Sequence, residues 1–212
     1  MAAPIRRGRK SVRDMTKHLF FEGPSGCGKS SAILRELNDL LPYAGGFCTS
    51  RMIDEKGNAC GFRHVAPIEF SSLTELYEPG LAGMFIESFE EEFSFHREVI
   101  RTTSLDMLRD SVGKRLYLID EIGGTELQIP EFTEALIYRL NSEIPCVGVW
   151  KAENNSLSMK RRLKTGNEYL MAYSNFRDFL TGHKGVTLIS LNGEHREAIS
   201  HALRCWRTTN EL

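Results

Sequence analysis

One eight-residue segment constrains this chain more than any other part of its sequence. Residues 23–30 read GPSGCGKS and satisfy the pattern GxxxxGK[ST] in full. A short apolar run precedes the segment at residues 18–22, and residues 31–41 follow with apolar side chains at helical spacing. Glycines within the segment permit backbone conformations in which successive N–H groups point inward around an anion. The segment is therefore predicted to be a phosphate-binding loop between a strand and a helix.

The residue types in this loop predict separate roles for its side chains. Lys29 is expected to reach the β- and γ-phosphates of a bound nucleotide, and the Ser30 hydroxyl to coordinate Mg²⁺. The alternative is a chance glycine-rich turn beside a lysine, which the flanking strand and helix disfavour. The predicted nucleotide-binding residues are Gly23, Pro24, Ser25, Gly26, Cys27, Gly28, Lys29, Ser30 and, as a weaker spare hydroxyl, Ser31.

A second feature is an acid pair at the end of a compact apolar run. Residues 115–120 read RLYLID, which is typical of a central strand that is buried on both faces. Asp120 then stands at the carboxyl end of that strand, where open α/β sheets bind their ligands. We expect Asp120 to hold Mg²⁺ and Glu121 to orient or deprotonate an attacking water, so Lys29, Asp120 and Glu121 are the predicted catalytic residues. An acidic helix start is the alternative interpretation of the pair.

The rest of the chain alternates short apolar runs with stretches of helical spacing, which predicts an α/β fold with a mainly parallel central sheet. Two β-like runs are separated by IDEKGN, whose Asp, Gly and Asn suit a tight reversal, so a β-hairpin insertion is expected there. Residues 67–101 show no clear period and are expected to be irregular with short helices. Strands are expected at 18–22, 45–52, 59–66, 115–120, 145–150, 168–173 and 186–191, and helices at 31–41, 103–112, 129–142, 156–165, from Asn175, and at 194–206.

Composition limits the classes of partner. The 212 residues carry 27 basic and 28 acidic side chains for a net charge of −1, which disfavours nucleic acid as a partner. No apolar run approaches the roughly eighteen residues of a membrane span, so no membrane partner is expected. The five cysteines are odd in number and scattered, which fits a reducing cytoplasm. We expect one domain over residues 18–212, preceded by a solvated basic tail at 1–17.

Further motifs carry a family resemblance. The chain reads GFCT at residues 46–49, GF at 61–62 and LIDEIG at 118–123, spaced around the phosphate loop. Over residues 18–192 it resembles the small nucleoside-triphosphatase family whose human member is called cancer-related nucleoside-triphosphatase. The resemblance implies a RecA-like P-loop fold, a three-layer sandwich, and slow magnesium-dependent hydrolysis of several nucleoside triphosphates with little base preference.

The chain departs from the family pattern at three places. Arg51 stands where the family usually has glutamate, two places after the threonine of its GFxT motif. Thr125 replaces the methionine of DEIGxMEL, whereas Glu126 is kept. The late Asn-Arg-Asp of the family is matched only as FRD at residues 176–178, which contains Arg177.

Hydrolysis usually needs a cation on the charge that develops at the phosphate, and arginine suits this role because it is planar and permanently charged. Arg51 and Arg177 are favoured over Arg161 and Arg162, whose basic cluster is typical of a solvated helix face. Glu126 is expected either to orient the site or to cap the helix predicted at 129–142.

The leading functional expectation is an enzyme that splits ATP, and also GTP, CTP and UTP, into the diphosphate and phosphate. The same loop and magnesium site could move the γ-phosphoryl group to a hydroxyl instead, as in a nucleotide or small-molecule kinase, with residues 156–165 as a mobile basic lid. A nucleotide-gated adaptor that acts through residues 67–101 or the basic tail is a third possibility. The second half of the chain has no NKxD motif, which disfavours a signalling GTPase.

Overall fold

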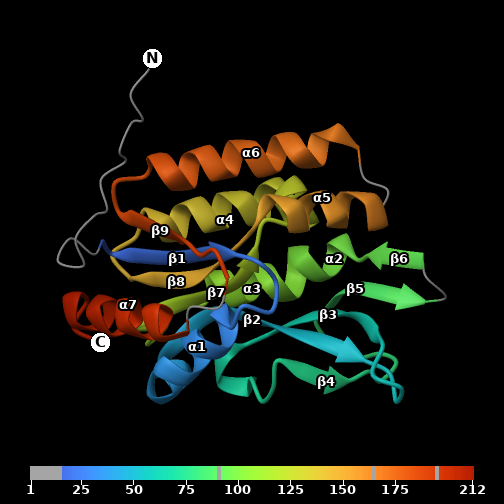
Figure 1. The fold of residues 1–212 in the computed structure, drawn as a ribbon, viewed down its shortest axis with the longest axis horizontal. Helices are drawn as coiled ribbons and strands as arrows, with labels where there is room; N and C mark the ends of the chain where they lie inside the picture. Colours follow the sequence, from blue (N-terminus) through green and yellow to red (C-terminus); the bar gives the residue numbers. More distant parts are fainter. Residues whose placement is uncertain (1–15, 90–91, 164–165, 194–195) are drawn as a thin grey trace.

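The computed structural model describes residues 16–89, 92–163, 166–193 and 196–212. A mixed β-sheet crosses the molecule, with helices on both of its faces (Figure 1). Its strands are hydrogen-bonded in the order β6-β5-β3-β2-β7-β8-β1-β9, and β4 pairs with β2 beside this path. The strands are β1 (His18–Gly23), β2 (Ala44–Ile53), β3 (Ala59–Val65), β4 (Thr74–Leu76), β5 (Met84–Phe89), β6 (Glu92–Phe95), β7 (Leu116–Ile122), β8 (Cys146–Lys151) and β9 (Val186–Ser190).

The parallel half of the sheet decides the fold class. Strands β2, β7, β8, β1 and β9 pair in parallel in that order, so the first strand of the chain lies between β8 and the last strand, β9. This order is that of a RecA-like sheet, and it confirms the predicted α/β class with a mainly parallel sheet. It also brings the carboxyl ends of β1, β7 and β8 to one edge, where ligands bind in open α/β sheets.

Helices cover the two faces unequally (Figure 1). Helices α1 and α7 pack together on one face, and α3, α4 and α6 contribute to the hydrophobic core on the other. The helices are α1 (Lys29–Glu36), α2 (Arg97–Val99), α3 (Leu105–Arg109), α4 (Pro130–Leu140), α5 (Glu153–Arg162), α6 (Asn167–Gly182) and α7 (Arg196–Thr209). Shorter 3-10 segments lie at Asn38–Tyr43, Pro67–Glu69 and Thr125–Gln128, and a π-helical turn at Ile100–Ser104.

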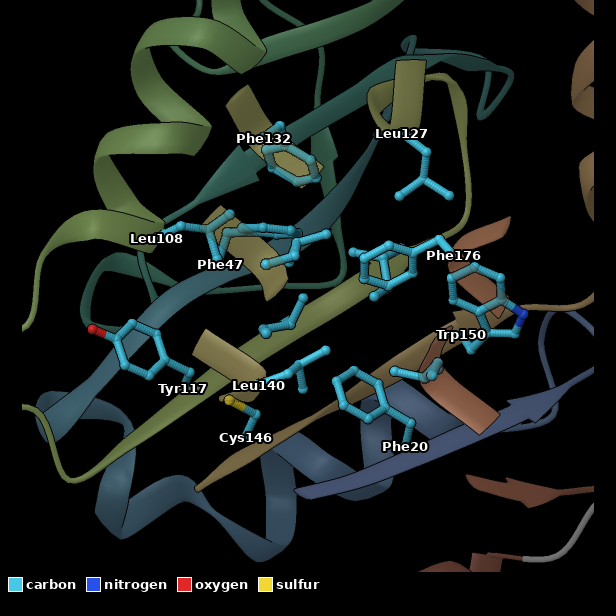
Figure 2. Packing of buried hydrophobic residues seen from close by; sticks show 14 of the residues in the cluster. Phe20, Phe47, Leu108, Tyr117, Leu127, Phe132, Leu140, Cys146, Trp150 and Phe176 are labelled. Atoms are coloured by element: carbon cyan, nitrogen blue, oxygen red, sulfur yellow. The ribbon is translucent and has the colours of Figure 1, made fainter. Parts of the chain in front are cut away.

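The alternation of side chains along each central strand explains the two cores. In β7, Tyr117 and Ile119 face the core under α4, whereas Leu116 and Leu118 face the core under α1 and α7. Strand β1 divides in the same way, because Phe20 joins the first core and its neighbours the second. Figure 2 shows the first core, where labelled side chains of the sheet meet Phe132 and Leu140 of α4, Phe176 of α6 and Leu127. Burial on both faces is why these strands read as continuous apolar runs.

The predicted hairpin is confirmed, and one glycine of the GFCT motif allows its first strand to pair with β7. Strands β2 and β3 pair antiparallel around the turn at residues 54–58, and β2 also pairs parallel with β7. Gly46 has φ +83°, and a Cβ at this position would lie 2.1 Å from the Leu118 carbonyl oxygen. Only glycine therefore allows β2 to approach β7 at this register.

The prediction of a strand at 168–173 is wrong, because these residues form the first half of α6. Tyr169, Tyr173, Phe176 and Leu180 are all buried, and their spacing of four, three and four residues is that of one helix face. A six-residue window is too short to show this period, and its aromatic side chains favour a strand by composition alone. The helix expected from Asn175 is the second half of the same element.

The irregular structure predicted at 67–101 is also wrong in its central part. Strands β5 and β6 extend the sheet beyond the hairpin, because β5 pairs antiparallel with β3 and β6 with β5, whereas β4 pairs in parallel with the end of β2. Strands β4 and β6 have only three and four residues, and β5 reads MFIESF, so none of the three shows the continuous apolar run of a central strand. Short helical turns do occur on both sides of them, at Pro67–Glu69 and Arg97–Val99.

Several element boundaries differ from the sequence predictions. The helix predicted at 31–41 is α-helical only to Glu36 and continues as a 3-10 segment that contains Pro42. The helix predicted at 103–112 begins with the π-helical turn at Ile100 and ends at Arg109. Residues 1–15 of the predicted tail, and 164–165 and 194–195 of two predicted helices, lie outside the described residues. Within the described parts of the chain, no helix is long and apolar enough to cross a membrane.

Buried His64 should make stability fall on acidification. Its ring lies between Phe47 and Phe85, at centroid distances of 4.0 and 4.1 Å, and its Nδ1 lies 2.7 Å from the Ser104 hydroxyl. Burial, and to a smaller degree the charge of Lys151, lowers the pKa of His64 from 6.5 to about 3. At a pH between these two pKa values, His64 is protonated in the unfolded chain but neutral in the folded one. The free energy of unfolding therefore falls as the pH falls through this window.

The His64→Gln variant should lose this part of the pH dependence. His64 contributes at most about 1.4 kcal/mol per pH unit below its unfolded pKa, or about 2 kcal/mol between about pH 6.5 and 5. Urea unfolding at a series of pH values measures the slope, which should be shallower by this amount in the variant. Equal slopes in the two proteins would show that His64 binds protons equally in the folded and unfolded states, and would contradict a lowered pKa.

Candidate active site

The phosphate loop lies between β1 and α1, where the sequence predicts it. Gly26 and Gly28 have φ of +79° and +89°, the left-handed region that glycine adopts without strain. The Lys29 ammonium donates hydrogen bonds to the carbonyl oxygens of Gly23 and Pro24, at 2.9 and 2.7 Å. The side chain thus folds back under the loop, and Lys29 is only 5% exposed. The loop is built around this buried cation.

The serine and the aspartate predicted to hold a metal lie together. The Ser30 hydroxyl donates a hydrogen bond to Asp120 Oδ1 at 2.7 Å, although 90 residues separate them in the chain. Asp120 is 2% exposed, and burial raises its pKa to about 7, against the opposing effect of the Ser30 hydrogen bond. Two side-chain oxygen atoms therefore meet in the site, and oxygen is the donor type that Mg²⁺ prefers.

Thr49 connects β2 to the acid pair, a contact that the sequence analysis missed. Its hydroxyl donates to the backbone oxygen of Asp120 and accepts a hydrogen bond from the Glu121 N–H at 3.2 Å. The threonine of the GFCT motif thus fixes the backbone at the end of β7. The GFCT motif could have drawn attention to Thr49, because this motif occurs together with LIDEIG in the family that the chain resembles.

Glu126 has a structural role in the turn after the acid pair. Its Oε1 accepts hydrogen bonds from the N–H groups of Gly123 and Gly124, at 2.9 and 2.7 Å. Gly123 has φ +114°, and a Cβ there would lie 2.9 Å from the Lys151 Cβ. Glu126 is 4% exposed and does not line the cleft, so it orients the turn that follows Glu121. The helix start at Pro130 has no side-chain cap, which removes the capping alternative.

A cleft of about 260 Å³ opens above the loop and the acid pair. From the loop, its walls include side chains or backbone of Ser25, Gly26, Gly28, Lys29, Ser30 and Ser31. Beyond the phosphate loop it is lined by Thr49, Arg51, Phe62, Leu73, Thr74, Asp120, Glu121, Val149 and Arg196. Gly23, Pro24 and Cys27 belong to the loop but do not line the cleft, and the carbonyl oxygens of the first two accept the Lys29 hydrogen bonds. Buried Cys27 packs in the core beneath it.

Of the two arginines favoured from the sequence, only Arg51 lies in the cleft. Arg51 lines the cleft, with its guanidinium carbon 5.9 Å from the centre of the Phe62 ring. Arg177 does not line it, because its guanidinium binds both carboxylate oxygens of Glu22 at 3.1 Å. Arg161 is exposed on α5, and none of the described residues of α5 lines the cleft, so the basic lid of the kinase alternative finds no support here.

Arg196 is the arginine that the sequence analysis missed. It begins α7, lines the cleft, and its Nε lies 3.1 Å from where a Cβ on Gly28 would stand. Arg51 from β2 and Arg196 from α7 therefore reach the cleft from different elements. The sequence offered no signal for Arg196, since its place beside the loop depends on the packing of α7 against α1.

A glycine-rich loop around a buried lysine, and a serine–aspartate pair on a RecA-like sheet, define the class of P-loop nucleotide-binding proteins. The chain belongs to the NTPase family of nucleoside-triphosphatases, whose sequence model matches residues 18–202. The match covers the phosphate loop, the acid pair and Arg196. The resemblance stated from the sequence is thereby confirmed.

Individual relatives agree with this assignment. The chain is 25% identical over 162 residues to a protein named nucleoside-triphosphatase THEP1 from Sulfurisphaera tokodaii, a match that covers 74% of this chain and 86% of the relative. The fold is similar to that of THEP1 from Aquifex aeolicus, with a TM-score of 0.57, 16% identity, and coverage of 88% and 96%. It is also similar to a human cancer-related nucleoside triphosphatase, with a TM-score of 0.58, 18% identity, and coverage of 91% and 98%.

Proposed function

We propose that this nucleoside-triphosphatase depends on Mg²⁺, hydrolyses nucleoside triphosphates to diphosphate and phosphate, and has little base preference. The observation that carries the proposal is the Ser30–Asp120 contact of 2.7 Å on the floor of a cleft that Lys29 and Glu121 also line. One cleft is thus lined by groups that would bind the phosphates, by oxygen atoms that would hold a metal and by a carboxylate that would accept a proton from water. These are the parts that phosphoryl transfer to water requires.

Ser30 and Asp120 are the residues that would hold Mg²⁺, which when bound would neutralise charge on the phosphate oxygens. The N–H groups of the loop and the N-terminus of α1 would bind the β-phosphate, because they present positive partial charge to the cleft. Lys29 would move its hydrogen bonds from the loop carbonyls to the phosphate oxygens. Ser31 lines the cleft beside Ser30 and would contact the phosphates.

Glu121 is the residue that would orient or deprotonate water. Its side chain is 29% exposed and lines the cleft next to Asp120, so water can reach it. Its backbone is fixed by Thr49, which limits where the carboxylate can lie. A carboxylate in this place can accept a proton from water as the bond to the γ-phosphate forms.

Arg51 and Arg196 are the cations we assign to the developing negative charge, since both line the cleft. Arg177 is instead proposed as a support for the strand before the loop, through its ion pair with Glu22. The weak base preference is supported by the cleft walls. Beyond the loop, Thr49 and the acid pair, the described lining residues are Arg51, Phe62, Leu73, Thr74, Val149 and Arg196. Of these, Phe62, Leu73 and Val149 can pack against any base, because apolar contact does not depend on the base's pattern of donors and acceptors.

Product analysis distinguishes hydrolysis from transfer to another acceptor. The protein is incubated with ATP labelled at the γ-phosphate, together with a panel of nucleosides and nucleoside monophosphates. We expect the label as free phosphate at the same rate with and without the panel. Label in a nucleotide product would show that the protein is a kinase and would contradict the proposed function.

The Asp120→Asn variant should need more magnesium. Asparagine can still accept the Ser30 hydrogen bond but lacks the charge, so metal affinity should fall while the local geometry is kept. The Mg²⁺ concentration for half-maximal phosphate release is expected to rise about tenfold or more. Asp106→Asn, an exposed position on α3, is the matched control and should leave the requirement unchanged. An unchanged magnesium requirement in Asp120→Asn would remove Asp120 from the metal site.

A further inference from the structure

Lys151 is a largely buried lysine beside the acid pair. It ends β8, and its register partner in β1 is Gly23, the first residue of the phosphate loop. Its carbonyl oxygen accepts a hydrogen bond from the Tyr173 hydroxyl at 2.9 Å, and that hydroxyl accepts another from the Trp150 indole at 3.1 Å. The backbone of Lys151 is therefore held firmly between the sheet and α6.

The side chain of Lys151 lies among carboxylates. Its Nζ is 3.5 Å from Glu121 Oε2, and the Lys151 side chain is 12% exposed. Glu126, which is fixed by two backbone N–H groups, and Asp120 also interact electrostatically with the ammonium. Burial disfavours the charged ammonium, but the negative charges of Glu121 and Glu126 outweigh this and raise the pKa of Lys151. The Lys151 ammonium thus lies beside Glu121 and within electrostatic reach of Glu126 and Asp120.

Lys151 does not line the cleft, whereas Glu121 does. The ammonium therefore does not contact the space assigned to the phosphates, and it acts on the reaction through Glu121. One oxygen of Glu121 is directed inward by the ion pair, while the 29% exposed side chain still reaches the cleft. An unpaired glutamate at this exposure would sample several rotamers.

We propose that Lys151 is a positioning residue, which holds the Glu121 carboxylate in the orientation needed to engage water. This inference rests on the proposed role of Glu121. The fixed backbone of Lys151 on one side, and the turn held by Glu126 on the other, give the ion pair a rigid frame. Misplacement of a catalytic group by about 1 Å can cost about a hundredfold in rate, so an anchor of this kind is consequential.

A double-mutant cycle tests the inference. Nucleotide affinity and single-turnover phosphate release are measured for the full chain and for Lys151→Met, Lys151→Arg, Glu121→Gln and the Lys151→Met/Glu121→Gln double variant. In Lys151→Met, affinity should stay within about threefold and the rate should fall about 10- to 100-fold. Lys151→Arg should recover part of the rate because it restores the ion pair. The double variant should be no slower than Glu121→Gln alone, since Lys151 acts only through Glu121.

The alternatives give different results. If Glu121→Gln hydrolyses normally, the proposed role of Glu121 fails and the inference about Lys151 fails with it. If Glu121→Gln is slow but Lys151→Met keeps its rate, or if the two effects multiply in the double variant, only the inference about Lys151 is overturned.

Separate measurements control for effects of the substitutions on folding. Thermal unfolding and nucleotide binding report on the fold of each variant, and Lys114→Met, which breaks the Lys114–Asp110 ion pair away from the cleft, should leave the rate unchanged. If Lys151→Met does not fold, Lys151→Gln replaces it with the same expectations. The double variant also removes both partners of the ion pair, so it should fold even where an unpaired Glu121 destabilises the single variant.

Discussion

Replacement of Lys29 by alanine should abolish nucleotide binding and turnover together. The ammonium is the cation at the centre of the phosphate loop, and its hydrogen bonds to Gly23 and Pro24 also hold the loop in shape. The variant therefore loses both a charge on the phosphates and part of the scaffold that presents the loop N–H groups. We expect the dissociation constant to rise about a hundredfold or more, which corresponds to the loss of about 3 kcal/mol.

Titration with a fluorescent nucleotide and an assay of phosphate release measure the two effects of Lys29→Ala. Lys56→Ala is the matched control, because Lys56 is an exposed lysine in the hairpin turn and lies away from the cleft. It should bind and hydrolyse as the unaltered protein does. Near-normal affinity in Lys29→Ala would mean that the nucleotide does not bind in this loop.

Replacement of Glu121 by glutamine should separate binding from turnover. Glutamine has the size of glutamate but is a poor proton acceptor, so the loop should still hold the nucleotide while water is no longer activated. We expect affinity within about threefold and a rate of phosphate release lower by about 10² to 10⁴. Glutamine also weakens the ion pair with Lys151, which acts in the same direction.

The same two assays measure Glu121→Gln, with Glu134→Gln as the control. Glu134 is an exposed glutamate on α4 and does not line the cleft, so its replacement should change neither quantity. Loss of binding in Glu121→Gln, in parallel with turnover, would show that the residue supports the loop or the metal instead of acting on water.

The parts of the site that were predictable from sequence are those encoded in short contiguous motifs. The loop at residues 23–30 carries its glycines, lysine and serine together, and the flanking strand and helix follow from apolar spacing. Asp120 and Glu121 were found because a buried central strand has a continuous apolar run and its end is recognisable. The residues of its turn were sufficient to predict the antiparallel hairpin.

The parts that were missed depend on contacts distant in sequence. Arg196 reaches the loop only because α7 packs on α1, and Lys151 meets Glu121 only because β7 and β8 are neighbours in the sheet. A signal for Lys151 did exist, since it follows the predicted strand at 145–150 at the ligand-binding edge of the sheet. For α6, the short window hid a helical period that runs to Leu180.

The most direct test of magnesium-dependent hydrolysis with little base preference is phosphate release from ATP, GTP, CTP and UTP, each measured with Mg²⁺ and with a chelator in its place. The proposed function predicts release from all four nucleotides with rates within about tenfold of one another, because the apolar side chains of the cleft can pack against any base. It also predicts that the chelator removes this activity, since Ser30 and Asp120 are the residues proposed to hold the metal. Undiminished release without Mg²⁺, or release from a single nucleotide alone, would contradict it.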